Sequence, residues 1–286
     1  MKPPLFRYHD PASVAEAVAL LASTDNAKLL AGGQSLMPML NMRLVLPDDL
    51  IDLNRIDTLA HVRENGDVLE IGAMTRQREL ERSAVVRARC PLLTAAIEHV
   101  GHQQTRNRGT LGGSLCHLDP SAELVAAAMT LDAVVSVTGR GGERKIPFAQ
   151  FPQAYMTPAI APDELVIAVS LPLWGRGHGH AFLEFARRHG DFAVCAVAVM
   201  LEKNAAGAIT RAAITVAGLD AAPVRVAAAE RALLGQVPSE ALFRAAAEHC
   251  RELDAVGDVH APAAYRQHLA AVLAKRALAE AAARCH

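Results

Sequence analysis

The chain has 286 residues, of which 51% are hydrophobic and 21% are charged, and its formal net charge is −1. This composition is typical of a globular protein with material for about two domains. The near-neutral charge and the aromatic content of 4% argue against binding of a nucleic acid, which needs a basic surface and stacking side chains. No segment is apolar enough to span a bilayer and no secretion signal opens the chain, so the sequence predicts a cytoplasmic protein.

The first half of the chain predicts short helices alternating with strands. A capping pattern at Ser13 precedes a helix in "AEAVALLAS", and "AKLLAGG" reads as a buried strand that enters a glycine turn. Further strands are expected in "LPDDLIDLNRI" and in "GDVLEIGAM", the latter with Gly66 and Asp67 at its turn. The stretches "TRQRELERSAVV", "PLLTAAIEHVG" and "SAELVAAAM" predict helices, and Gly101 is placed to end the second of them.

The second half predicts a hairpin, a sheet and a helical end. "DAVVSVTGRGGERKIPF" reads as two strands joined by a glycine-rich turn, and "DELVIAVSLPL" as another strand. The glycine- and histidine-rich segment 174–181 is the expected domain boundary. After it come three strands of an antiparallel sheet, at 181–188, 192–202 and 208–218. The remainder predicts helices at 224–235 and 239–250, and from about Ala263 to the end.

Two glycine-rich motifs carry the first indication of function. We call Ala31–Ser35, which follows a predicted strand, the first glycine loop, and Thr110–Ser114 the second glycine motif. Neither fits the dinucleotide or nucleoside triphosphate fingerprints. Consecutive glycines let backbone N–H groups converge on an anion, and each motif adds a serine hydroxyl. The motifs are therefore either two unrelated turns or the two parts of a site for one ligand with two phosphates.

Other residue types give little sign of chemistry. The five cysteines are scattered without a CxxC pair, which predicts reduced thiols and no iron–sulfur or zinc site. The twelve histidines form no ligand cluster, and no nucleophile with its base stands out, so we expect no metal site and no catalytic side chain. Arg106 and Arg108 precede the second glycine motif. They either neutralise a bound diphosphate or are surface charges.

Several stretches resemble the FAD-binding medium subunit of the molybdenum hydroxylases, a family that includes aerobic-type carbon monoxide dehydrogenases and the flavin portion of xanthine dehydrogenase. They occur in family order over nearly the whole chain: "LLAGGQSLMPMLNMRLVLPDDLIDL", "IGAMTRQREL", "RNRGTLGGSLCHLDPSAEL", "RRHGDFAVCAVAVML" and "AAPVRVAAAERALLG". The resemblance implies an α+β chain. An FAD-binding PCMH-type (vanillyl-alcohol-oxidase-like) domain would cover 1–175, in two α/β subdomains of about 1–57 and 58–175. A C-terminal CO-dehydrogenase-flavoprotein-like domain with a three-stranded antiparallel sheet and helices would cover 176–286.

The resemblance also implies a set of FAD contacts. The first glycine loop matches the motif whose amides hold the FAD pyrophosphate, and the second glycine motif matches the family's second flavin motif. Glu123 stands where the family has an acidic residue near the ribose end, and Phe192 where an aromatic residue lies beside the isoalloxazine ring. Leu165 lies in a segment that lines the flavin in relatives, Val100 falls near a backbone contact, and Glu184 stands where some relatives have lysine. The implied contacts are Ala31, Gly32, Gly33, Gln34, Ser35, Val100, Thr110, Leu111, Gly112, Gly113, Ser114, Glu123, Leu165 and Phe192.

The function implied is that of an electron-transfer subunit that carries FAD. An iron–sulfur small subunit and a large molybdopterin subunit would be its partners, in a dimer of heterotrimers, and would carry the [2Fe-2S] clusters and the molybdopterin. Electrons would reach FAD from the clusters and leave to an external acceptor such as NAD, a quinone or oxygen. Two alternatives stay open: a stand-alone FAD-dependent oxidoreductase, and a non-enzymatic assembly module whose glycine motifs are only turns.

Overall fold

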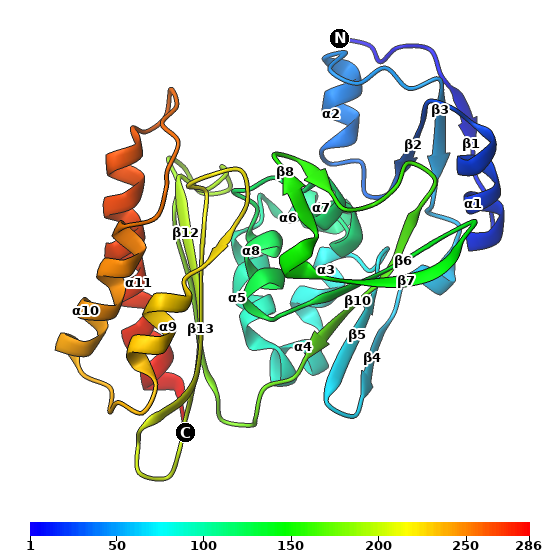
Figure 1. Cartoon of the computed structure of the whole chain (residues 1–286). Coiled ribbons are helices and arrows are strands. Elements are labelled where there is room, and N and C mark those ends of the chain that lie inside the picture. The colour runs from blue at the N-terminus through cyan, green and yellow to red at the C-terminus, as the bar shows by residue number, and fades with distance from the viewer.

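A three-stranded parallel sheet forms one end of the molecule in the computed structural model, which describes residues 1–286 (Figure 1). Its strands are β1 (Arg7–His9), β2 (Ala27–Leu30) and β3 (Asp49–Asp52), in the order β1-β3-β2. Parallel strands need crossover connections, and α1 (Val14–Ser23) connects β1 to β2, which pair with opposite edges of β3. The predicted cap is confirmed, because the Ser13 hydroxyl accepts from the Glu16 N–H at 3.2 Å. Strand β1 was not predicted.

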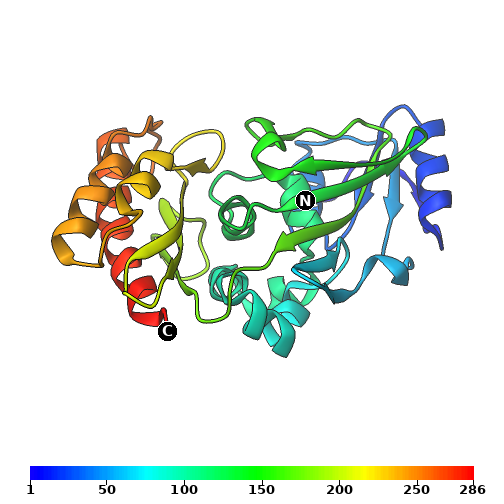
Figure 2. The same ribbon diagram turned by 60° about the horizontal axis from the view of Figure 1, so that its bottom comes forward.

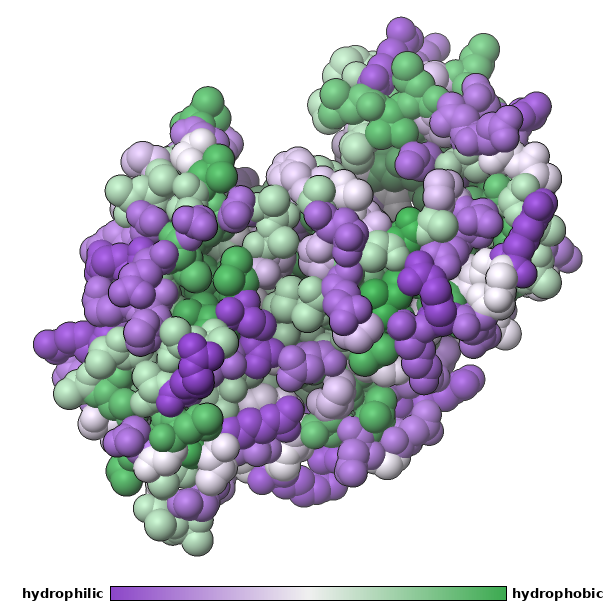
Figure 3. Space-filling view, viewed as in Figure 1, coloured by the Kyte–Doolittle hydropathy of each residue, from purple (hydrophilic) through white to green (hydrophobic).

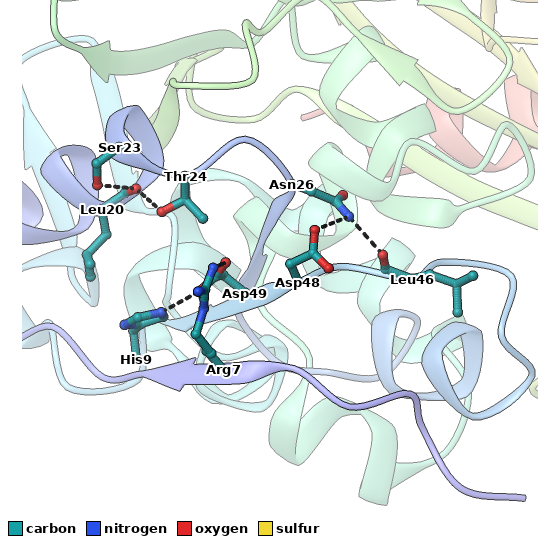
Figure 4. A network of polar contacts seen from close by, with 9 residues as sticks. All are labelled: Arg7, His9, Leu20, Ser23, Thr24, Asn26, Leu46, Asp48 and Asp49. Carbon is teal, nitrogen blue, oxygen red and sulfur yellow. Dashed lines mark hydrogen bonds and ion pairs between the residues drawn. The ribbon is translucent and has the colours of Figure 1, made fainter.

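A buried carboxylate ties the edge strand β1 to β3 (Figure 4). Asp49, whose side chain is 2% exposed, accepts hydrogen bonds from Arg7 at 2.8 and 2.6 Å and lies 2.7 Å from Nε2 of His9. The hydrogen bonds from Arg7 and then His9 lower the pKa of Asp49 to about 2. Asn26 adds a second tie, because its Nδ2 donates to the carbonyl of Leu46 and to Asp48. This network fixes the sheet whose β2 leads into the first glycine loop.

A five-stranded antiparallel sheet lies next in the chain, in the order β4-β5-β10-β6-β7. Its strands are β4 (Val62–Asn65), β5 (Val68–Gly72), β6 (Val134–Gly139), β7 (Gly142–Pro147) and β10 (Leu165–Pro172). The predicted hairpin and the strand at 163–173 are confirmed. The strand expected in "GDVLEIGAM" is the second arm of a hairpin, whose first arm β4 was not predicted. The short pair β8 (Pro152–Ala154) and β9 (Thr157–Pro158) lies between β7 and β10.

Six short helices between β5 and β6 fill the centre of the molecule (Figure 1). They are α3 (Gln77–Arg82), α4 (Ala84–Arg89), α5 (Pro91–His99), α6 (Gln103–Arg108), α7 (Leu111–His117) and α8 (Glu123–Thr130). The helix predicted in "TRQRELERSAVV" is two helices, because Ser83 ends α3 and its hydroxyl caps α4. Gly101 follows Val100, the C-cap of α5, with a positive φ of 46°, as predicted.

The C-terminal part is a sheet covered by helices on both faces (Figures 1 and 2). The predicted three-stranded antiparallel sheet is confirmed as β11 (Gly179–Phe185), β12 (Cys195–Lys203) and β13 (Ile209–Ala217). The short β14 (Val224–Arg225) adds a fourth strand where a helix was expected to begin. The outer helices are α9 (Ala227–Leu233), α10 (Glu240–Arg251) and α11 (Ala263–Arg284).

Strand β12 explains why its sequence reads as a continuous apolar run. Ala196, Ala198 and Met200 belong to the large core shared with α5 and α8, whereas Val197 and Val199 belong to the core under α11. Both faces of the strand are therefore buried. The small alanine side chains on the inner face let the helices of the first part pack close to the sheet.

The segment that follows α2 (Leu36–Asn41) in the chain exposes apolar side chains (Figure 3). Met42, Leu44 and Leu46 are 51%, 68% and 57% exposed. Exposed patches of this kind are typical of protein–protein interfaces. No helix in the structure combines the length and the apolar composition needed to cross a lipid bilayer.

Candidate functional site

The two glycine motifs meet in the structure, although the first follows β2 and the second follows α6, far along the chain. A Cβ placed on Gly32 would lie 2.3 Å from the carbonyl oxygen of Arg108 and 2.8 Å from the Cα of Gly109. A Cβ on Gly113 would lie 3.3 Å from that of Ala31. The first distance is shorter than any side chain permits, so glycine at position 32 is what allows the two backbones to touch.

The first glycine loop presents a row of free backbone donors. The N–H groups of Gly32, Gly33, Gln34 and Ser35 have no acceptor within the protein. Gly33 has a φ of 72°, which turns the chain before α2 begins. A cavity of about 440 Å³ lies beside the loop, a size typical of ligand pockets. It is lined by Leu30, Gly32, Gly33, Gln34, Met37, Pro38, Asn41 and Arg108. Consecutive free N–H groups at a cavity form an anion-binding nest.

The second glycine motif has a different local structure: it is the first turn of α7, with Thr110 as its cap. The amides of 111–114 are already used. The N–H of Leu111 donates to Thr75, that of Gly112 to Ala73 at 2.8 Å, and that of Gly113 to the Thr110 hydroxyl at 3.1 Å. A Cβ on Gly112 would lie 2.6 Å from that of Ala73, so this glycine lets the helix pack closely on the residue that follows β5. The amides of 111–114 are thus bound within the protein, whereas four amides of the first glycine loop have no protein acceptor. Cofactor contacts of both motifs stay predictions.

The two arginines before the second glycine motif have separate roles. Arg106 is bound within the protein, since it donates to Glu81 at 3.0 Å and to the carbonyl of Val100 at 3.0 Å. Arg108 lines the cavity and takes part in no ion pair. The sequence left open a diphosphate contact or a surface charge for both. Arg106 is instead paired inside the protein, and Arg108 is a cation without an ion-pair partner beside the nest.

Asn54 and Arg76 were missed in the sequence and complete the contact between the motifs. Asn54 Nδ2 donates to the carbonyl of Ala31 at 3.0 Å, and Arg76 donates both to Asn54 Oδ1 and to the carbonyl of Arg108. Burial, and after it the positive charge of Arg108, lowers the pKa of Arg76. The only signal in the sequence was position, because both residues come shortly after a strand ends.

Helix α6 separates Val100 and Phe192 from the glycine motifs. Phe192 is 58% exposed in the loop between β11 and β12. A Cβ on Gly190 of that loop would lie 2.8 Å from the His102 ring, just beyond Val100 at the end of α5. Helix α6 starts after His102, ends at Arg108 beside Gly32, and spans roughly 9 Å.

Glu123 and Leu165 are buried, and neither side chain lies free at the cavity. Glu123 begins α8, and burial raises its pKa to about 7, with the charge of Glu184 adding to the effect. Glu184 itself contacts His99, whose Nδ1 is 3.2 Å from Oε1 of Glu184. Leu165 is 1% exposed in the small core against which Ala31 packs, so it supports the first glycine loop from behind. Cofactor contacts of these residues stay predictions.

The thiols and the other titratable clusters offer no competing site. Burial raises the pKa of the thiols of Cys90, Cys116, Cys195 and Cys250 to about 12, which keeps them protonated and unreactive. No group of three or more histidine, cysteine or acidic side chains is arranged to hold a metal ion. Neither the thiols nor a metal cluster therefore competes with the nest and its cavity as the candidate site.

Comparison with known proteins places the chain in a family. Residues 4–174 match the FAD binding domain in molybdopterin dehydrogenase, and residues 180–281 match the CO dehydrogenase flavoprotein C-terminal domain. The 6-hydroxypseudooxynicotine dehydrogenase complex subunit alpha of Paenarthrobacter nicotinovorans is 41% identical, over 98% of this chain and 96% of that protein. Caffeine dehydrogenase subunit beta of Pseudomonas sp. (strain CBB1) is 38% identical, over 99% and 97%.

A solved structure agrees with these matches. A chain of the carbon monoxide dehydrogenase from Hydrogenophaga pseudoflava superimposes with a TM-score of 0.97 at 37% identity, and the match covers 100% of both chains. The fold predicted from the resemblance is thus confirmed, as is the oxidoreductase class. The chain belongs to the FAD-binding medium subunits of the molybdenum hydroxylases.

Proposed function

We propose that this chain transfers electrons from the iron–sulfur clusters of a partner subunit, through FAD, to an external acceptor. The observation that carries the proposal is the row of free N–H groups in the first glycine loop, with Arg108 as an unpaired cation at the same cavity. Both features favour a diphosphate, the most anionic part of FAD. The residues present therefore fit the cofactor that the family carries.

Each part of the site has a proposed task. The amides of the first glycine loop hold the pyrophosphate, and Arg108 neutralises its charge. The second glycine motif packs against that loop and contacts the cofactor. Phe192 lies beside the isoalloxazine ring, Val100 is near a backbone contact to the cofactor, and Glu123 is near the ribose end. When bound, FAD supplies the redox chemistry, whereas the protein supplies binding, orientation and electrostatics.

The domain division and the assembly are part of the proposal. We assign 1–175 to the FAD-binding domain, with subdomains of about 1–57 and 58–175, and 176–286 to the C-terminal domain. The partners are an iron–sulfur small subunit and a large molybdopterin subunit, in a dimer of heterotrimers. The names of the relatives, which call them subunits or medium chains, support an assembly of several chains.

Stepwise reduction of the purified complex tests this route. The complex is stripped of FAD, and part of it is then reloaded with FAD. With the oxidisable substrate, the stripped complex should still bleach its iron–sulfur absorption but should not reduce the external acceptor, and reloading should restore that step. Acceptor reduction by the stripped complex at the full rate would contradict the route.

Two further results would favour the alternatives. If the isolated chain with FAD oxidised an organic substrate, it would be a stand-alone oxidoreductase. If a complex purified with its partners contained no flavin and took up none from solution, the chain would be an assembly module.

A further inference from the structure

Asn54 and Arg76 join three segments that are distant in the sequence. Asn54 follows β3 of the parallel sheet, Arg76 precedes α3 in the second part, and Arg108 ends α6. The Asn54 side-chain amide donates to the carbonyl of Ala31, and its oxygen accepts from Arg76. Arg76 uses a second nitrogen for the carbonyl of Arg108. One continuous chain of hydrogen bonds therefore runs from the first glycine loop to Arg108, two residues before the second glycine motif.

The bond to Ala31 determines where the free donors of the loop point. Each peptide unit is planar, so a carbonyl held on one side fixes the N–H of the next residue on the other side. Asn54 holds the carbonyl of Ala31, and the next N–H is that of Gly32, the first of the four without a protein acceptor. Removal of this bond would free the loop to rotate its donors away from the cavity.

The guanidinium of Arg76 suits this position because it is planar and carries several donors in fixed directions. It reaches acceptors on two different segments at once, which the single ammonium of a lysine does with difficulty. Arg76 is partly buried and close to Arg108, and it takes part in no ion pair. The two neighbouring positive charges add to the positive potential at the nest, which favours an anion there.

We propose that Asn54 and Arg76 are positioning residues for the diphosphate of FAD. They hold the first glycine loop against the backbone of Arg108 and Gly109 with its free N–H groups facing the cavity. This inference rests on the proposed FAD site and adds to it two residues that bind the cofactor through the backbone they orient.

Binding measurements on the purified complex test the inference. The dissociation constants of FAD and riboflavin, which lacks the diphosphate, are measured for wild type, Arg76→Met, Arg76→Lys, Asn54→Ala and the double variant Asn54→Ala with Arg76→Met. Arg78→Met is the matched control, since Arg78 lies in the first turn of α3, two residues after Arg76, and pairs with Glu81 at 2.8 Å. Thermal unfolding of the FAD-free proteins shows which variants fold.

We expect the Kd for FAD to rise about tenfold in Arg76→Met and in Asn54→Ala, the scale of a lost hydrogen bond to a charged group. Riboflavin binding should change by less than about twofold, and Arg78→Met should match wild type in both. Because the two residues act through one bridge, the double variant should bind FAD no more weakly than the weaker single variant. Arg76→Lys should not restore wild-type affinity.

Several outcomes would overturn the inference. They are an unchanged Kd for FAD in both single variants, equal losses for FAD and riboflavin, additive losses in the double variant, or full affinity in Arg76→Lys, which would mean that charge alone matters. If Arg76→Met does not fold, Asn54→Ala and Arg76→Lys decide. A wild-type complex that binds no FAD would instead overturn the proposed function itself.

Discussion

The first glycine loop and the second glycine motif have similar sequences, but their backbone amides have different hydrogen-bond partners. Both contain two adjacent glycines, with a serine close behind. In the first, the N–H groups of four consecutive residues have no protein acceptor, and three of these residues line a cavity. In the second, the amides of 111–113 are bound by Thr75, Ala73 and the Thr110 hydroxyl. A pair of glycines can therefore present amides to a ligand or allow close packing, and the hydrogen-bond partners of the amides distinguish the two roles.

The largest effect on the cofactor is expected from Gly32→Ala. The new methyl group would meet the Arg108 carbonyl at 2.3 Å, so the first glycine loop must move away from its neighbour. We expect the purified complex to contain almost no FAD, with a loss of affinity of at least about a hundredfold, since the nest and Arg108 would no longer act together. Flavin absorbance per mole of protein measures this. Full flavin content would show that the contact between the motifs is dispensable.

Gly112→Ala should separate packing from binding. Its methyl group would lie 2.6 Å from the Cβ of Ala73, in a buried contact between α7 and the residue after β5. We expect overpacking to lower the free energy of unfolding by about 1–3 kcal/mol. The protein that stays folded should bind FAD far better than Gly32→Ala does. Denaturant unfolding and flavin titration test the pair, and equal flavin loss in both variants would remove the distinction drawn between the motifs.

A smaller effect is expected from the arginines. Arg108→Met removes the free cation at the nest and should weaken FAD binding about tenfold at low salt, with a smaller difference at high salt because ions screen the charge. Arg106→Met breaks the pair with Glu81 and should mainly lower the melting temperature. Titrations at two salt concentrations compare them. A greater loss of affinity in Arg106→Met would reverse the assignment.

The smallest effect, on stability, is expected from the residues that precede α2 and α7. The Thr110 hydroxyl caps α7 by accepting from Gly113, whereas Ser35 makes no such bond at α2. Thr110→Val should therefore cost about 1 kcal/mol of stability, and Ser35→Ala close to none. Thermal unfolding of the FAD-free chain measures both. A loss in Ser35→Ala as large as that in Thr110→Val would indicate an unseen role for the serine in the fold.

The sequence predicted most elements because their patterns are local. The helix capped by Ser13, the hairpin at 132–148 and the strands of the C-terminal sheet were recognisable from spacing and turn residues. The weak strands β1, β4 and β14 were missed, since two to four residues carry little pattern and depend on a partner strand. The break at Ser83 was missed for a related reason: a serine inside a helical pattern can face solvent or cap a new helix.

The site was predicted through its glycines and only in part. The family resemblance located the residues of both motifs, but the amino-acid sequence cannot show which amides already have hydrogen-bond acceptors within the protein. Asn54 and Arg76 escaped because their role comes from three segments that meet only in the folded chain. Arg106 and Arg108 could not be told apart for the same reason, as Glu81 lies far from both in the sequence.

The alanine-lined inner face of β12 has a consequence for any attempt to divide the protein. A fragment that ends near residue 175 would leave the central helices α5 and α8 without the sheet that covers them, and would expose a broad apolar wall to water. Such a fragment should aggregate or bind chaperones instead of behaving as an independently folded FAD-binding domain. The two halves are thus joined by a shared interior, and neither can be transplanted without the other.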